Sequence, residues 1–260
     1  MKIEFAANVP ADAAVIARAV RKGAVVDGPG GALLADAARA QRFEGDAGSV
    51  AEAFVAHDGK TVRIVLLGVG KGDDAEYERA GGALTARLLT SGETLVVADL
   101  PGAGATAAAR FAAGAAQRAW RFDEYRTKLT DKQKPTLETV VIAGADAGAA
   151  DAFAAYDAVT AGLSLARTLA TLPPNILYPQ SFVERVVAAV DGLGLEVTVL
   201  DEAAMRDLGM GALLGVSQGS RREARLLALK WNGGDEGAPL TALVGKGVTF
   251  DTGGISIKPA

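Results

Sequence analysis

Runs of apolar, β-branched residues alternate along the chain with longer segments of helical periodicity, and this alternation restricts the fold more than any other feature. The expected strands lie at residues 2–7, 61–70, 94–100, 137–144, 195–201, 224–231 and 240–250. The expected helices lie at residues 32–41, 73–92, 105–125, 147–172, 181–194 and 202–215. Strands that alternate with helices form α/β layers around a largely parallel sheet. The sequence therefore predicts the α/β class.

The same pattern divides the chain into three parts. We expect an N-terminal α/β domain at residues 1–146, a linker helix at 147–172, and the N-terminal part of a second α/β domain at 173–260. Pro173 and Pro174 end the linker helix, because proline lacks a backbone N–H and restricts the residue before it. The third part has few elements with which to close a sheet, so we expect it to be incomplete.

The composition limits the classes of partner. Half of the 260 residues are apolar, which is enough for one large core or two smaller ones. The net charge of −4 and the pI near 5.2 provide no overall positive field for a phosphate backbone or an anionic membrane surface. No segment approaches the ~20 apolar residues of a membrane span, and the N-terminus has no signal-peptide stretch. We expect a soluble, cytoplasmic protein that binds neither nucleic acid nor membrane.

Cysteine is absent and His57 is the single histidine. Disulfides, thiolate zinc sites and a cysteine nucleophile are therefore excluded, and so are zinc sites built from several histidines. His57 lies in VAHDGK, at an expected strand end and turn, where an exposed position is favoured. Asp235 and Glu236 lie in a glycine-rich polar cluster that is typical of a surface turn. Any chemistry must rest on carboxylates, lysines, hydroxyls or the backbone.

A glycine-rich turn gives an alternative interpretation as a nucleotide-binding module. In PGAGATAAA, Gly102, Gly104 and Ala107 form a GxGxxA pattern between an expected strand and a helix. Asp123 and Glu124 follow at roughly the distance of a ribose-binding acid. That acid belongs at the end of a second strand, whereas here it lies at the end of a helix that runs into a polar loop. An ordinary strand-to-helix turn is favoured, and the alternative stays open.

The segment 243–260, LVGKGVTFDTGGISIKPA, carries Lys246, Asp251 and Lys258 within an apolar run. A carboxylate can bridge two divalent cations, and a lysine ligates a metal only as the neutral amine, a form that burial beside cations favours. A second lysine that stays protonated stabilises an oxyanion. Extended chain would separate Lys246 from Asp251 by about 16 Å, so the glycines between and around them must allow a bend. The alternative is a hairpin with two solvent-facing lysines.

The string VGKGVTFDTGGISIKP closely resembles the metal-site signature of the leucine aminopeptidase family, the cytosolic dinuclear-metal aminopeptidases. YDAVTAGLSLARTLATLPPNILYPQSF is similar to that family's linker helix and asparagine-proline segment, and GMGALLGVSQGSRREARLLALKW to the run before its metal strand. The resemblance covers most of the chain and is strongest from about residue 155. It implies an N-terminal three-layer, macro-like α/β domain, a linker helix and the incomplete start of an α/β catalytic domain.

The resemblance also implies residue roles and partners. Lys246 would ligate one metal ion, Asp251 would ligate both, and Lys258 would be the catalytic lysine. The cofactors would be two divalent ions, Mn²⁺ or Zn²⁺, with bicarbonate in the intact enzyme. The substrates would be peptides with apolar, leucine-like N-terminal residues, and the intact enzyme would be a homo-hexamer.

The family's other metal ligands belong in segments that should follow residue 260. We therefore expect a chain truncated within the catalytic domain, without peptidase activity or oligomerisation of its own. A noncatalytic structural fragment remains the third interpretation.

Overall fold

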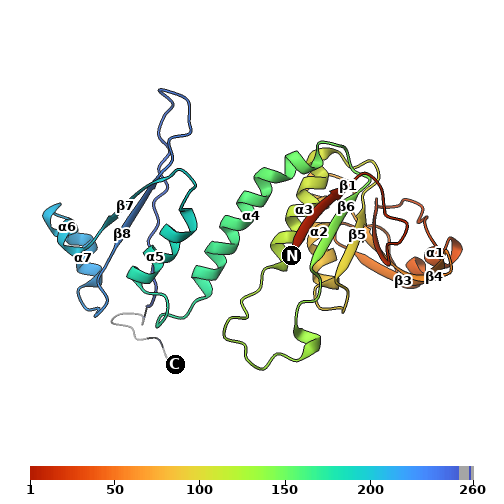
Figure 1. Cartoon of the computed structure of the whole chain (residues 1–260), viewed down its shortest axis with the longest axis horizontal. Coiled ribbons are helices and arrows are strands. Elements are labelled where there is room, and N and C mark those ends of the chain that lie inside the picture. Colours follow the sequence, from red (N-terminus) through yellow and green to blue (C-terminus); the bar gives the residue numbers. More distant parts are fainter. Residues whose placement is uncertain (252–257, 259–260) are drawn as a thin grey trace. The chain divides into compact units, whose positions relative to one another are not determined.

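The computed structural model describes residues 1–251 and 258, and its contacts divide the chain into two units, Met1–Arg167 and Thr168–Ala260 (Figure 1). Helix α4 (Ala149–Thr171) contains the point of division. The domain boundaries predicted at residues 146 and 172 stay a prediction. Within the described residues, no helix is both long and apolar enough to cross a lipid bilayer.

The first unit is built on a six-stranded sheet with the order β1-β6-β5-β2-β4-β3. All neighbours pair in parallel except β3, which forms an antiparallel hairpin with β4. The predicted α/β class with a largely parallel sheet is thereby confirmed. The strands are β1 (Lys2–Ala6), β2 (Val15–Val20), β3 (Val50–His57), β4 (Lys60–Gly68), β5 (Leu95–Asp99) and β6 (Thr139–Ala143).

The sheet is covered on both faces, because successive strand residues point to opposite sides. Ile16 and Ile64 pack with Leu34 of helix α1 (Ala32–Ala40) on one face. Val65 and Leu67 pack on the other face in the main core, with helices α2 (Asp74–Leu88) and α3 (Ala105–Ala119). Strand β4 is buried on both sides, which explains its nearly continuous apolar sequence. The first unit therefore has three layers.

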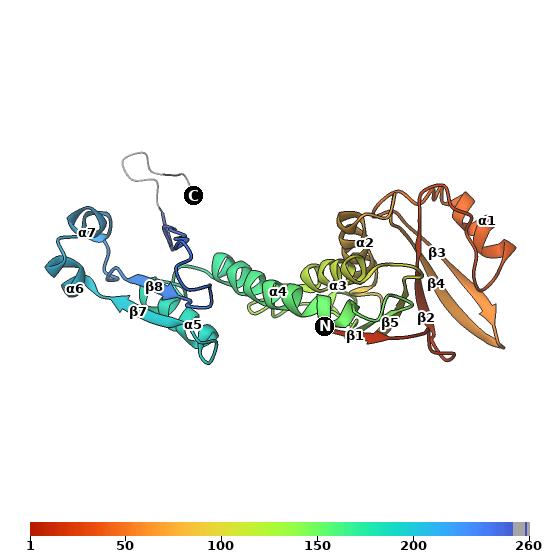
Figure 2. The same ribbon diagram turned by 90° about the horizontal axis from the view of Figure 1, so that it is seen from above.

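Helices α2 and α3 lie side by side and approach each other closely through two glycines (Figure 2). A Cβ on Gly81 would lie 1.9 Å from the carbonyl oxygen of Phe111, and a Cβ on Gly114 would lie 1.9 Å from that of Glu78. No side chain larger than hydrogen fits either position without displacing backbone. The helix pair is thus specified by residues that are poor helix formers by themselves.

Helix α2 begins at a capping box that its sequence encodes. The carboxylate of Asp73 accepts a hydrogen bond from the backbone N–H of Glu76 at 2.9 Å, and the carboxylate of Glu76 accepts one from the backbone N–H of Asp73 at 3.1 Å. These bonds satisfy two amides that the helix leaves without a partner.

In the part of the second unit that the structure describes, a two-stranded antiparallel sheet lies with three helices that follow α4. Its elements are α5 (Pro179–Val190), β7 (Glu196–Leu200), α6 (Glu202–Asp207), α7 (Gly211–Ser217) and β8 (Leu226–Lys230). Buried apolar side chains are few here, and they include Val183, Val186 and Met205. Both strands are mostly exposed.

The structure corrects three of the expected elements and adds a strand. The helix predicted at 202–215 is two helices, because Gly209 takes a left-handed conformation with φ of 70° between them. The helix predicted at 105–125 ends at Ala119, and a loop with a short 3-10 helix, η1 (Asp131–Gln133), follows. No strand forms over residues 240–250, all of which the structure describes. Strand β2 was not predicted.

Candidate functional site

The segment that follows β8 carries the predicted site residues and has no regular secondary structure up to Asp251. Lys246 and Asp251 are both exposed. The N–H of Val248 donates a hydrogen bond to the carbonyl oxygen of Lys246 at 3.2 Å, which closes a tight turn around Gly247. The backbone therefore bends between the lysine and the aspartate, as their spacing required.

Asp251 and Lys258 lie together. The Lys258 Nζ donates a hydrogen bond to Oδ2 of Asp251 at 2.8 Å, and the two side chains are 61% and 55% exposed. An ion pair this open to solvent contributes about 1 kcal/mol or less. The pair brings two of the three predicted site residues into contact, and the third, Lys246, has an exposed side chain in the same segment. Residues 252–257 and 259–260 lie outside the described residues.

The described residues do not by themselves form a metal site. They contain no group of three or more histidine, cysteine, aspartate or glutamate side chains that could hold a metal ion. Two divalent ions need several oxygen or nitrogen ligands each, whereas this segment provides one carboxylate and one candidate amine. The roles of Lys246, Asp251 and Lys258 stay predictions.

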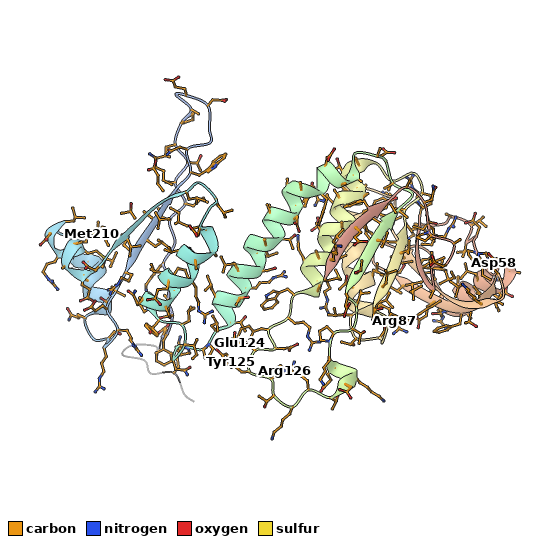
Figure 3. The ribbon with its side chains drawn as sticks, viewed as in Figure 1. Asp58, Arg87, Glu124, Tyr125, Arg126 and Met210 are labelled. Carbon is orange, nitrogen blue, oxygen red and sulfur yellow. The ribbon has the colours of Figure 1, made fainter. Side chains whose placement is uncertain are left out.

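The other polar residues that the sequence offered as candidates lie at the surface. His57 is half exposed at the end of β3, and Asp58 and Gly59 form the hairpin turn to β4 with φ of 48° and 74° (Figure 3). Asp235 and Glu236 are exposed in the loop after β8. None of these side chains lies in a group that could hold a metal among the described residues.

The nucleotide-binding alternative is not supported. The turn after β5 leads to α3 with Gly104 as its N-cap, as a phosphate-binding turn would. Asp123, however, lies in the loop after α3, where it forms ion pairs with Arg121 at 2.7 Å and Arg126 at 3.5 Å. The next strand along the chain, β6, begins only at Thr139, so no strand end places this acid beside the turn.

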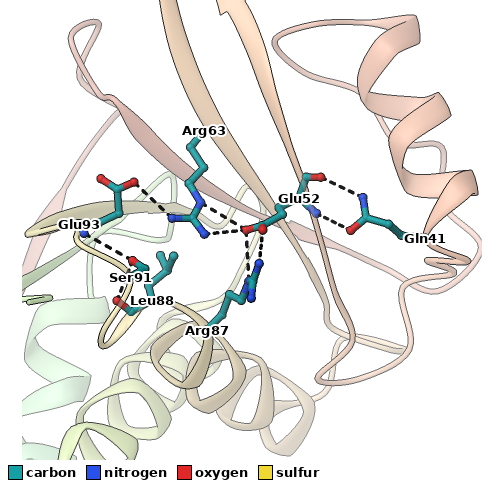
Figure 4. A network of polar contacts seen from close by, with 7 residues as sticks. All are labelled: Gln41, Glu52, Arg63, Arg87, Leu88, Ser91 and Glu93. Carbon is teal, nitrogen blue, oxygen red and sulfur yellow. Dashed lines mark hydrogen bonds and ion pairs between the residues drawn. The ribbon is translucent and has the colours of Figure 1, made fainter. Parts of the chain in front are cut away.

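A network centred on Glu52 was not predicted from the sequence (Figure 4). The Glu52 carboxylate accepts hydrogen bonds from Arg63 Nη2 at 2.8 Å and from Arg87 Nε at 3.2 Å, while Arg63 Nη1 donates to Glu93 at 3.3 Å. The hydrogen bond from Arg87, together with that from Arg63, lowers the pKa of the Glu52 carboxyl. Glu52 lies in β3 and Arg63 in β4. No sequence motif predicts that Glu52 also pairs with Arg87 of α2.

Comparison with known proteins gives matches along most of the chain. The model of the cytosol aminopeptidase family, N-terminal domain, matches residues 12–129, and the model of the same family's catalytic domain matches residues 164–260. The chain belongs to the cytosol aminopeptidase family. The predicted resemblance to the leucine aminopeptidases is thereby confirmed.

Curated members of the family are similar over nearly the whole chain. A probable cytosol aminopeptidase of Bradyrhizobium sp. is 43% identical over 251 residues, which covers 93% of this chain and 50% of the relative. A probable cytosol aminopeptidase of Rhizobium meliloti is 41% identical over 279 residues, which covers 100% of this chain and 55% of the relative. The chain thus spans about half the length of the curated relatives that it matches.

Solved structures have a similar fold over most of this chain. The bottromycin maturation enzyme BotP in complex with Mn is 29% identical with a TM-score of 0.77, and the match covers 95% of this chain and 51% of that one. A mutant of tomato leucine aminopeptidase is 20% identical with a TM-score of 0.71, and the match covers 88% of this chain and 50% of that one. The tomato enzyme is similar in fold alone.

Proposed function

We propose that the full-length protein is a metal-dependent aminopeptidase that releases N-terminal residues, apolar ones in preference, from peptides. The observation that carries this proposal is the match to both domains of one peptidase family, since the catalytic-domain match includes the segment with Lys246, Asp251 and Lys258. The names of the curated relatives and the Mn complex of BotP support the same activity and its metal dependence.

The proposal gives each predicted residue a role. Lys246 would hold one of two divalent ions, Mn²⁺ or Zn²⁺, Asp251 would hold both, and bicarbonate would belong to the complete site. The ions would supply an activated water. Lys258 would donate a hydrogen bond to the oxyanion that develops on the scissile carbonyl. Its contact with Asp251 at 2.8 Å supports this assignment, because it brings the ammonium to the carboxylate that would hold the ions.

The remaining parts of the proposal concern the whole protein. The substrate is a peptide with a free, leucine-like N-terminal residue, the assembly is a homo-hexamer, and the location is the cytoplasm. The names of the relatives support the location and the reaction class. The 260-residue chain is proposed to be inactive without the further ligands, because its described residues do not form a metal site.

The test is leucyl-p-nitroanilide hydrolysis by the full-length protein with added Mn²⁺, compared with Lys258→Ala. Removal of one oxyanion donor should lower kcat by about 10²–10³-fold with little change in KM. Lys230→Ala is a matched control, because Lys230 is 58% exposed and pairs with Glu196 at 3.6 Å, much as Lys258 pairs with Asp251.

Asp251→Asn tests the metal assignment by a different measurement. The variant should bind less Mn²⁺ at equilibrium, measured by atomic absorption after dialysis, and should lose activity with it. Equal activity of Lys258→Ala and Lys230→Ala, or full metal content in Asp251→Asn, would refute the assigned roles. Absence of any turnover by the metal-loaded full-length protein would refute the function itself.

A further inference from the structure

A cavity of about 650 Å³ lies on the first unit, along the exposed sides of α2 and α3. Its lining comes from the first half of α2, from four positions of α3 and the residue after it, and from one position of α4. The lining residues are Ala75, Glu78, Arg79, Arg110, Gly114, Gln117, Arg118, Trp120 and Arg167. The volume is in the range of small-molecule sites.

The charge of this lining is opposite to that of the chain. Four arginines and one glutamate line the cavity, which gives three positive charges in excess, whereas the whole chain has a net charge of −4. The cavity thus gathers local positive potential on an otherwise acidic protein. A concave surface that concentrates one sign of charge attracts ligands of the other sign.

Two of the arginines are held in place by neighbours within the cavity. Arg110 forms an ion pair with Glu78 at 2.7 Å, which neutralises the one acidic group of the lining. Arg167 Nη1 donates to the backbone carbonyl oxygen of Gln117 at 2.8 Å, and its guanidinium carbon lies 5.8 Å from the centre of the Trp120 ring. These contacts fix the positions of both guanidinium groups before any ligand binds.

The other two arginines have their donors open to solvent. Arg79 and Arg118 are exposed, and within the described part of the chain neither side chain makes a hydrogen bond or an ion pair. The Cγ and Cδ atoms of Arg79 lie over Gly48, where an added Cβ would come within 3.0 Å and 3.1 Å of them, so the stem of the side chain is packed. The guanidinium is left to face solvent.

We propose that this cavity, the arginine cavity, binds a compact anion that carries two or more phosphate or carboxylate groups. Guanidinium groups recognise both groups through paired, charge-assisted hydrogen bonds. Arg79, Arg118 and Arg167 contact the anion, and Trp120 lies beside it. The site is separate from Lys246, Asp251 and Lys258, and it does not depend on the proposed peptidase activity.

Trp120 provides the readout. The chain has two tryptophans, and Trp231 is exposed in the loop after β8, so Trp231→Phe leaves Trp120 as the one emitter. Titration of this variant with pyrophosphate and, separately, with citrate should change the Trp120 emission with a Kd of about 1 mM or lower. Calorimetry on the unmodified chain should give the same Kd. Tighter binding of pyrophosphate assigns phosphate ligands, and tighter binding of citrate assigns carboxylates.

A double variant tests the location. Arg79→Gln with Arg118→Gln should raise the Kd by about tenfold or more, because charge-assisted hydrogen bonds are lost. Arg206→Gln with Arg221→Gln is the matched control, since it removes two exposed arginines of the second unit and changes the net charge equally. Circular dichroism verifies that both double variants fold.

Three outcomes would overturn the proposal. The first is the absence of both an emission change and heat with either anion up to about 10 mM. The second is an unchanged Kd when Arg79 and Arg118 are replaced. The third is an equal loss of affinity in the control variant, Arg206→Gln with Arg221→Gln. The last would mean that general charge attracts the anion. Should Arg79→Gln with Arg118→Gln fail to fold, Arg118→Gln alone must still raise the Kd, and an unchanged value would also contradict the site.

Discussion

At the scale of the residue, the Glu52 network is a polar contact between partly buried side chains that the sequence did not predict. Glu52 is 19% exposed and Arg63 10% exposed, so water competes little for their hydrogen bonds. Arg87 extends the contact to α2, and Gln41 fixes the Glu52 backbone through bonds of 2.9 Å and 3.2 Å. The network joins the hairpin of β3 and β4 to helix α2, from which Arg87 reaches Glu52, while Gln41 approaches Glu52 from another side (Figure 4).

We predict that Glu52→Gln lowers the free energy of unfolding by about 1.5–3 kcal/mol at pH 7, because it removes charged hydrogen bonds and leaves the Arg63 charge poorly compensated. The measurement is the urea midpoint followed by Trp120 emission in the Trp231→Phe background. Glu138→Gln is the control, since Glu138 is an exposed glutamate of the same unit. A similar midpoint in both variants would mean that the network contributes nothing to stability.

The contribution of Glu52 to the free energy of unfolding should depend on pH. The pKa of the Glu52 carboxyl is lowered in the folded state, so the unfolded chain takes up a proton first as pH falls. The stabilisation is complete above the unfolded pKa of about 4.3 and is lost as pH falls through the lower, folded pKa. The difference between the wild type and Glu52→Gln should therefore be constant above about pH 5 and shrink towards pH 3. A difference that grows on acidification would contradict this.

Residue spacing predicted a bend between two of the candidate site residues, whose roles stay predictions. The spacing of Lys246 and Asp251 required a bend, and the turn at Gly247 provides one. The contact of Asp251 with Lys258 and the exposure of Lys246 could not be predicted, because local spacing does not determine tertiary contacts or burial. The roles of these residues rest on the family motif and not on geometry.

At the scale of the element, the contact of α2 with α3 depends on positions where a methyl group cannot fit. Gly81→Ala should destabilise the first unit by about 1–3 kcal/mol through overpacking, although alanine favours the helix by about 1 kcal/mol. Gly82→Ala is the matched control one residue along, because an added Cβ there meets the carbonyl oxygen of Gly114 at an ordinary 3.7 Å. It should be neutral or stabilising.

Thermal unfolding followed by circular dichroism checks this pair of variants. The Gly81→Ala midpoint should fall and the Gly82→Ala midpoint should stay or rise. Equal midpoints would mean that the helices shift apart without cost, so that the close approach does not specify the packing.

Apolar periodicity predicted the helices and strands that the local sequence determines. It missed those that depend on contacts with distant parts of the chain. Strand β4 is buried on both faces, so its apolar run was a strong signal. Strand β2 was missed because Arg18 interrupts its pattern, and only the structure shows that this charge pairs with Asp99 at 3.2 Å and Asp27 at 3.1 Å. Residues 240–250 have strand propensity but no partner strand among the described residues, and a strand requires one.

At the scale of the whole molecule, the two units differ in how much they bury. The first has a continuous core between its sheet and α2 and α3, whereas β7 and β8 are mostly exposed. Local stability follows buried apolar contacts and protected backbone hydrogen bonds. We predict that amides of β7 and β8 exchange with deuterium at least about 10²-fold faster than those of β4 and β5.

Hydrogen exchange followed by mass spectrometry at pH 7 measures this difference for each strand. Amides of η1, an exposed turn of the first unit, serve as the fast-exchanging reference. Equal protection of β7 and β4 would contradict the prediction, because it would require the second unit to be as stable as the first.

The family could be predicted from the sequence because its motif lies on contiguous residues, as the matches to both family domains confirm. The same motif predicted the reaction class, and the activity of the whole protein stays a proposal, because the chain spans about half the relatives' length and its described residues contain no group that could hold a metal ion.

The small sheet of β7 and β8 leaves one side of each strand without a neighbour among the described residues. The N–H and C=O groups along those two borders stay open to any extended backbone of suitable direction. In a concentrated or warmed solution, these open borders would allow strands of two molecules to pair, and charged or proline residues placed there would prevent it.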